Sequence, residues 1–190
     1  MLASSRSRLV FAALLTTQLG VLRAADKDAA VDRARREVRM LDDIYKGSIV
    51  TITQNYVNDK DTIPAGTAFK KLFEAVEKKG WHRVRLVDAT GEPYSDENVA
   101  KDAFEKAAIK KLVAGEAWVE KLETREGVKH LRVGTPIPVV FKKCVMCHDN
   151  YEGVKKGQAI GALIYTIPID GALRPLRGND EIPKYPMTKE

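Results

Sequence analysis

The residues with the most specific chemistry are Cys144, Cys147 and His148, which form a C-x-x-C-H motif three-quarters along the chain. Two thiols three residues apart project from one side of a helical turn, so each can form a thioether with one haem vinyl group. The adjacent imidazole is then placed to bind the iron as the proximal ligand. The chain has no other cysteine. The spacing therefore predicts one covalently attached c-type haem on Cys144, Cys147 and His148.

Other interpretations of the two cysteines stay open at this point. A thiol–disulfide oxidoreductase also uses C-x-x-C, but places it at a helix N-terminus early in a βαβ unit. Here the motif follows the proline-containing stretch 135–140 instead. Half of a zinc site or a simple structural disulfide would also use two cysteines, although the chain has only three histidines to complete a metal site. Haem attachment is favoured because it accounts for the adjacent histidine as well.

The sixth position of the iron has several candidate ligands. Imidazole is a common axial ligand, and His82 shares one face of an expected strand with Val84 and Leu86, so His82 is predicted as the distal ligand. Met40 is the fallback, with core packing as its alternative role. The other possibilities are an open position, or ligation by His130, Met187 or Tyr45.

Several basic residues are candidates for binding the haem propionates or an acidic redox partner. Ordinary solvated surface charge is the alternative for all of them. They are Arg83, Arg85, Lys142, Lys143, Lys155 and Lys156.

The beginning of the chain has the composition of a secretory signal peptide. Arg6 and Arg8 precede an apolar run over residues 9–22, and Arg23 and two alanines follow before the first acidic residue, Asp26. The run is shorter than the roughly 20 apolar residues that a membrane span requires. We predict a signal peptide over residues 1–24 and a mature protein in the periplasm or otherwise exported, with no stable membrane insertion.

The charge of the mature chain excludes one class of partner. The formal net charge is +6, and it falls to +3 without the three arginines of the predicted signal peptide. Such a small and evenly spread excess does not support nucleic-acid binding. With 44% hydrophobic residues the chain can bury a core. Neither the redox partner protein nor the oligomeric state follows from the sequence.

Hydrophobic periodicity predicts the elements that position the motif. A long helix is expected over 28–58 and a second helix from residue 63 to Gly80. A strand over 81–88 and a turn over 90–93 follow, and then a helix capped by Ser95 or Asp96 that runs to Val113.

The second half of the chain has the pattern of an antiparallel sheet. A hairpin is expected over 118–133, and Pro136 and Pro138 exclude the stretch 135–138 from a central strand. Residues 159–169 are nearly all apolar, as in a strand covered on both faces. The last segment, 171–190, is expected to be a flexible tail. The expected order is that of a PAS-like sheet: a strand, a short second strand, a helical segment and three further strands. This likeness of fold by itself says nothing about function.

Three segments around the motif carry a resemblance to a known family. They are WHRVRLVDATGEP over 81–93, TPIPVV over 135–140 and GQAIGAL over 157–163. The chain resembles, over about residues 30–170, the c-type haem PAS-like domain family first described in cyanobacteria. The resemblance implies an exported single-haem protein with the haem insertion before the last strand and a long N-terminal helix beside the sheet. One departure is that the family pattern uses a further cysteine as distal ligand, and this chain has none.

These observations define the expected protein. Its fold class is α+β, with a PAS-like antiparallel sheet, flanking helices and a haem domain over 59–170. Its expected function is one-electron transfer as a monohaem c-type cytochrome. The alternative is a haem-based redox or gas sensor that signals through a separate partner, and a peroxidase-like enzyme is the third hypothesis. We expect that the chain is not an enzyme.

Overall fold

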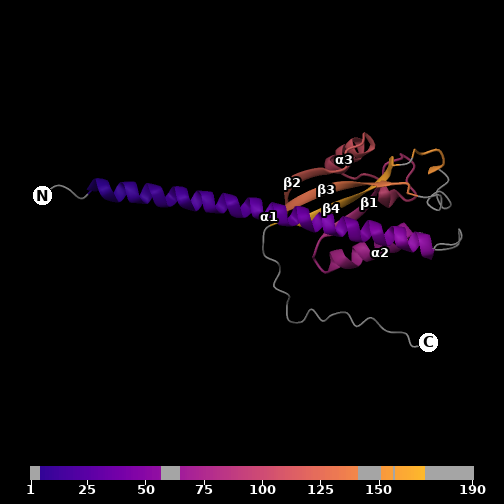
Figure 1. The fold of residues 1–190 in the computed structure, drawn as a ribbon, viewed down its shortest axis with the longest axis horizontal. Coiled ribbons are helices and arrows are strands. Elements are labelled where there is room, and N and C mark those ends of the chain that lie inside the picture. Colours follow the sequence, from indigo (N-terminus) through magenta and orange to yellow (C-terminus); the bar gives the residue numbers. More distant parts are fainter. Residues whose placement is uncertain (1–4, 57–64, 141–150, 156, 170–190) are drawn as a thin grey trace, which may run out of the picture.

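The computed structural model describes residues 5–56, 65–140, 151–155 and 157–169, and for residues 5–27 it describes the helical backbone alone. The helices lie mostly in the first part of the chain and three of the four strands follow one another at its end, as in an α+β protein (Figure 1). In chain order the elements are α1 (Ser5–Asn55), α2 (Ala65–Lys78), β1 (Arg83–Asp88), the 3-10 helix η1 (Asp96–Asn98), α3 (Ala103–Val113), β2 (Val119–Arg125), β3 (Val128–Pro138) and β4 (Ala159–Pro168).

The four strands form one antiparallel sheet in the order β1-β4-β3-β2. The last strand of the chain, β4, therefore lies in the middle, where Tyr165 pairs with Val84 on one side and with Val133 on the other. Its residues are buried from Ala159 to Ile167. This confirms the prediction that the apolar segment forms a strand covered on both faces.

Helices cover both faces of the sheet. In Figure 1 the helices α1 and α2 lie on one side and α3 on the other. Alternation along the strands separates two hydrophobic clusters, because neighbouring residues point to opposite faces. The α1 and α2 side contains Tyr45, Phe73 and Tyr165, and the α3 side contains Ala108 and Ile164.

Two glycines make the fold locally possible. A Cβ at Gly134 would lie 3.2 Å from both Ala108 Cβ and Ile164 Cδ1, so the missing side chain allows α3 to pack closely on β3. The β2–β3 hairpin turns through Glu126 and Gly127, which have φ values of 51° and 78°. Two consecutive left-handed residues are what a tight two-residue hairpin loop requires.

The prolines of β3 lie where the strand has a neighbour on one side only. The pairing of β2 with β3 ends at Val119 and Gly134, whereas Pro136 and Pro138 pair with β4 alone. Proline has no backbone N–H to donate, so it is tolerated at such an edge. The predicted edge character of 135–138 is confirmed, although the segment continues β3 rather than following it.

The segment between β1 and α3 differs from the prediction. Ser95 accepts the N–H of Glu97 at the start of η1, and α3 begins later, capped by Asp102, whose Oδ1 accepts the N–H of Glu105 at 2.9 Å. The prediction of one helix from residue 95 or 96 to Val113 is wrong because the backbone becomes extended at Val99.

The residues between β1 and η1 also form no second strand, contrary to the expected order. Asp88 Oδ2 accepts the N–H of Thr90 at 3.0 Å and of Gly91 at 2.7 Å. The chain therefore turns as soon as β1 ends.

In the part of the chain that the structure describes, no helix carries an apolar stretch long enough to cross a membrane.

Candidate functional site

The C-x-x-C-H motif, with Cys144, Cys147 and His148, lies outside the described residues. The structure gives the positions of the chain on either side of it. The chain leaves the sheet after Pro138, which pairs with Ala159 at the start of β4. The connection that carries the motif therefore starts and finishes at one end of the sheet.

A pocket of about 250 Å³ lies at this end of the sheet. Its walls come from α2, from the end of β1, and from the facing ends of β3 and β4, including Leu86, Ile137 and Ile160. Tyr151, three residues after His148 in the sequence, also lines the pocket. These apolar walls would suit one face of a porphyrin, because ligand pockets are mostly apolar with a few polar groups.

His82 lies just before β1 on the side covered by α1 and α2. Its side chain is 9% exposed, and its Nε2 lies 3.0 Å from the Tyr45 hydroxyl. Burial lowers the pKa of His82, so the imidazole is neutral at neutral pH. Burial and then the charge of Glu37 raise the pKa of Tyr45, which keeps its proton. With His82 protonated on Nδ1, Tyr45 donates this hydrogen bond to Nε2.

His82 and the β3–β4 connection lie at opposite ends of β1. Arg83 pairs with Thr166, whereas Asp88 pairs with Gly161 near the start of β4. Six residues of extended strand correspond to about 20 Å. For His82 to bind iron, either Nε2 gives up the Tyr45 hydroxyl or Nδ1 is the ligand. The assignment of His82 as distal ligand stays a prediction.

The other candidate distal ligands lie apart from His82, except Tyr45. Met40, the fallback, is 54% exposed on α1, so its alternative role as core packing is wrong. His130 lies on β3, and its Nδ1 is 2.9 Å from the carbonyl oxygen of Val128. Met187 lies outside the described residues.

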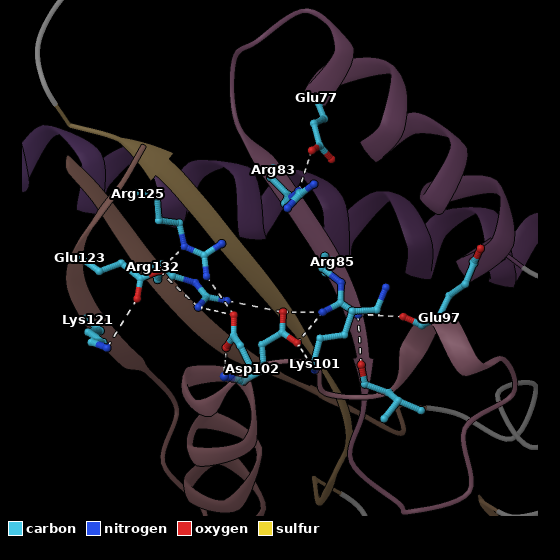
Figure 2. A network of polar contacts seen from close by, with 12 residues as sticks. Glu77, Arg83, Arg85, Glu97, Lys101, Asp102, Lys121, Glu123, Arg125 and Arg132 are labelled. Atoms are coloured by element: carbon cyan, nitrogen blue, oxygen red, sulfur yellow. Dashed lines mark hydrogen bonds and ion pairs between the residues drawn. The ribbon is translucent and has the colours of Figure 1, made fainter. Parts of the chain in front are cut away.

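The basic residues predicted for propionate binding have different environments. Arg83 is paired with Glu77 at 2.6 Å, and Arg85 is paired with Glu105 (Figure 2). Lys155 is exposed, whereas Lys142, Lys143 and Lys156 lie outside the described residues. Arg85 is therefore not a free cation, because it pairs with Glu105. It is not a solvated surface charge either, because Glu105 is only 2% exposed.

Arg85 belongs to a network of charged side chains on the α3 side of the sheet (Figure 2). Buried Glu105 lies between Arg85 and Arg132, with Arg132 Nη2 at 3.5 Å from Glu105 Oε1. Asp102 Oδ2 accepts from Arg132 Nη1 at 2.7 Å and from Arg125 Nη2 at 3.0 Å. Burial alone would raise the pKa of Asp102, but the N–H of Glu105 and the two arginines lower it overall.

Sequence reasoning missed most of this network. The feature of the sequence that could have indicated the network is Arg132, a charged residue between the apolar residues Leu131 and Val133 of an expected strand. A charge at every second position normally marks a solvated face. Here that face is covered by α3, and the guanidinium of Arg132 lies 4.5 Å from the ring centroid of Phe104.

A second network, also not foreseen, joins α1 to the sheet. Asp42 Oδ1 accepts the hydroxyls of Thr135 at 2.6 Å and Tyr165 at 3.0 Å, and Lys46 lies 2.9 Å from Asp42 Oδ2. Burial and the nearby charge of Asp42 raise the pKa of Tyr165. One carboxylate on α1 thus contacts β3 and β4 together.

The described residues contain no group of three or more His, Cys, Asp or Glu side chains placed to hold a metal ion. The fold and the pocket define an α+β domain with a four-stranded antiparallel sheet and a polypeptide insertion before its last strand.

Comparison with known families identifies this domain. The family model of the Tll0287-like domain matches residues 23–168, which is most of the chain, and the chain belongs to this family. It is the cyanobacterial c-type haem family that the sequence resembled, and membership indicates a haem-binding domain. No curated protein matches the chain.

Proposed function

We propose that this protein is an exported c-type cytochrome that carries one haem and transfers single electrons. The observation that carries the proposal is the C-x-x-C-H motif in a chain with only two cysteines, within a haem-binding family. When bound, the haem supplies a one-electron redox centre. Cys144 and Cys147 hold the porphyrin, and His148 binds the iron.

The pocket at the β3–β4 end supports the location of the haem. Tyr151 follows His148 by three positions, so the covalent chain keeps the two Cα atoms within about 11 Å of each other. Tyr151 lines this pocket together with Leu86 and Ile137. These side chains would exclude water from part of the haem, and burial is one of the properties that set a haem potential.

The topology supports the PAS-like comparison at the level of fold. The strand order β1-β4-β3-β2, with the insertion before the central last strand, agrees with that arrangement without its short second strand. The described segment from Ala89 to Ser95 turns instead of pairing with β1. The comparison concerns architecture and adds nothing about function.

A haem-based sensor is the second candidate, and one observation favours it. Asp42 ties α1 to Thr135 and Tyr165, which lie on the strands that precede and follow the motif. A change at the motif that shifts these strands would therefore also shift α1. A signalling partner can then bind the part of α1 that remains after removal of the predicted signal peptide.

Optical spectra of the exported protein test these proposals. Electron transfer predicts a low-spin haem in the oxidised and reduced states that does not bind carbon monoxide, because both axial positions are filled. Sensing predicts a displaceable sixth ligand and a shifted reduced spectrum with carbon monoxide. An open site with peroxidase turnover would contradict our expectation that the chain is not an enzyme. In the matched variant His148→Ala, loss of the proximal nitrogen should abolish the low-spin spectrum.

A further inference from the structure

A second cavity, of about 310 Å³, lies beside β1, which is an edge strand of the sheet. One wall is α2, and the opposite wall is η1 with the beginning of α3. Only Lys70, Leu86 and Asn98 line both this cavity and the pocket near the motif. The cavity, called the β1 cleft below, is therefore separate from the proposed haem site.

The β1 cleft is lined by charged side chains of both signs. Most of them are paired with one another, as Lys70 is with Glu97 and Arg83 with Glu77; Figure 2 shows the second of these pairs. Two charged residues of the lining, Glu74 on α2 and Lys101 before α3, belong to no ion pair within the described chain. Both side chains are exposed, so one acid and one base of the lining are accessible to a ligand.

The balance of charge limits the ligands that the cleft accepts. The lining has six basic residues and five acidic ones, and Glu123, which lies outside the lining and pairs with Arg125 and Arg132, balances the two signs. A ligand with one net charge would leave a charge without compensation in a partly buried site, which is unfavourable. A ligand that carries one positive and one negative group avoids this cost and matches both Glu74 and Lys101.

Two buried polar atoms of the lining also favour a ligand with one ammonium and one carboxylate group. Asn98 Oδ1 is an acceptor and Arg132 Nε is a donor, and neither has a hydrogen-bond partner within the described chain. Buried polar atoms in native proteins are rarely left without partners. Both residues line the cleft, so a ligand bound there could reach the two atoms after a side-chain shift or through a bridging water. An ammonium group and a carboxylate would supply the missing donor and acceptor.

We propose that the β1 cleft binds a small zwitterion with one ammonium and one carboxylate group, of the size of a free amino acid. Its volume of about 310 Å³ is at the lower end of ligand pockets, which span roughly 300–1,000 Å³, and suits a small ligand. Lys101 would contact the carboxylate and Glu74 the ammonium group. The proposal does not depend on the haem.

Thermal unfolding and calorimetry of the exported protein test this site. The probes are glycine, L-alanine and L-glutamine, compared with acetate and methylammonium at the same millimolar concentration. We expect at least one amino acid to raise the unfolding temperature, since a ligand bound only to the folded state stabilises it. Neither single-charge compound should do so. Glu74→Gln and Lys101→Gln should each weaken binding at least about tenfold, the equivalent of one lost charged contact.

Lys106→Gln is the matched control, because Lys106 is an exposed residue of α3 that does not line the cleft. It should leave the affinity unchanged. The proposal is overturned if no amino acid binds, if acetate or methylammonium alone gives the same shift, or if the two cleft variants bind as the control does. Covalent haem plays no part in these readouts, so failure here and failure of the proposed cytochrome function are distinguishable.

Discussion

Replacing His82 by glutamine is expected to remove a pH dependence of stability that the buried imidazole creates. Folding buries the ring against Tyr45 and lowers the pKa of His82 below its ordinary value of 6.5. The unfolded chain therefore binds a proton at a higher pH than the folded chain does. The contribution of neutral His82 to the free energy of unfolding is therefore present in full above about pH 6.5. It is lost as the pH falls from there toward the lowered pKa.

The size of this effect has an upper limit. If the folded pKa lies well below the range studied, His82 contributes a loss of about 1.4 kcal/mol between about pH 7.5 and pH 5.5. Glu37 acts in the opposite direction, because burial raises its pKa and its protonation therefore favours the folded state. The difference between the wild-type protein and His82→Gln cancels the contribution of Glu37.

Urea unfolding of the haem-free protein, in which His82 binds no iron, measures this difference when it is followed by circular dichroism at several pH values. Wild-type protein should lose stability on acidification relative to His82→Gln, whereas His130→Gln should keep the wild-type dependence because His130 is only half-buried at a strand surface. Parallel pH profiles for wild type and His82→Gln would refute the reasoning. They would mean that His82 is protonated equally easily in the folded and unfolded states.

Three further changes have defined outcomes. Glu105→Gln should lower the free energy of unfolding in urea by about 3 kcal/mol, because it leaves two arginines without their buried carboxylate. The control Glu116→Gln, at an exposed ion pair, should change it by less than about 0.5 kcal/mol. Asp42→Ala should cost about 2 kcal/mol or more in the same assay, since two buried hydroxyls lose their acceptor. In the haem-loaded protein, His82→Ala should convert a low-spin spectrum into a high-spin, carbon-monoxide-binding one, and exposed Met40→Ala should leave it unchanged; the reverse pattern would make Met40 the ligand.

The local elements of this fold were accessible from the sequence because they depend on short-range patterns. The run of apolar residues in β4 and the amphipathic stripe of α2 appear directly in the order of residues. The hairpin was accessible through Gly127, and the edge position of Pro136 through its missing N–H donor. The start of α3 was misjudged because Ser95 and Asp102 both have side chains suited to cap a helix.

The contacts that define the sites depend on residues far apart in the chain. Tyr45 and His82 are separated by 37 positions, and Asp42 and Tyr165 by 123. No periodicity indicates that Arg85 will pair with Glu105 of α3 rather than with a haem propionate. The core-packing role expected for Met40 was wrong because its apolar side chain is exposed on α1. Which helix covers which face is decided by tertiary packing, which the single sequence does not contain.

The most direct test of the account is whether haem is covalently attached. Protein produced in a host with the haem-attachment machinery and purified from the exported fraction is separated by denaturing electrophoresis and stained for haem. Wild-type protein should retain one haem per chain, and the variant with Cys144→Ala and Cys147→Ala should retain none. Haem-free wild-type protein in which both cysteines titrate as free thiols would contradict the proposed function.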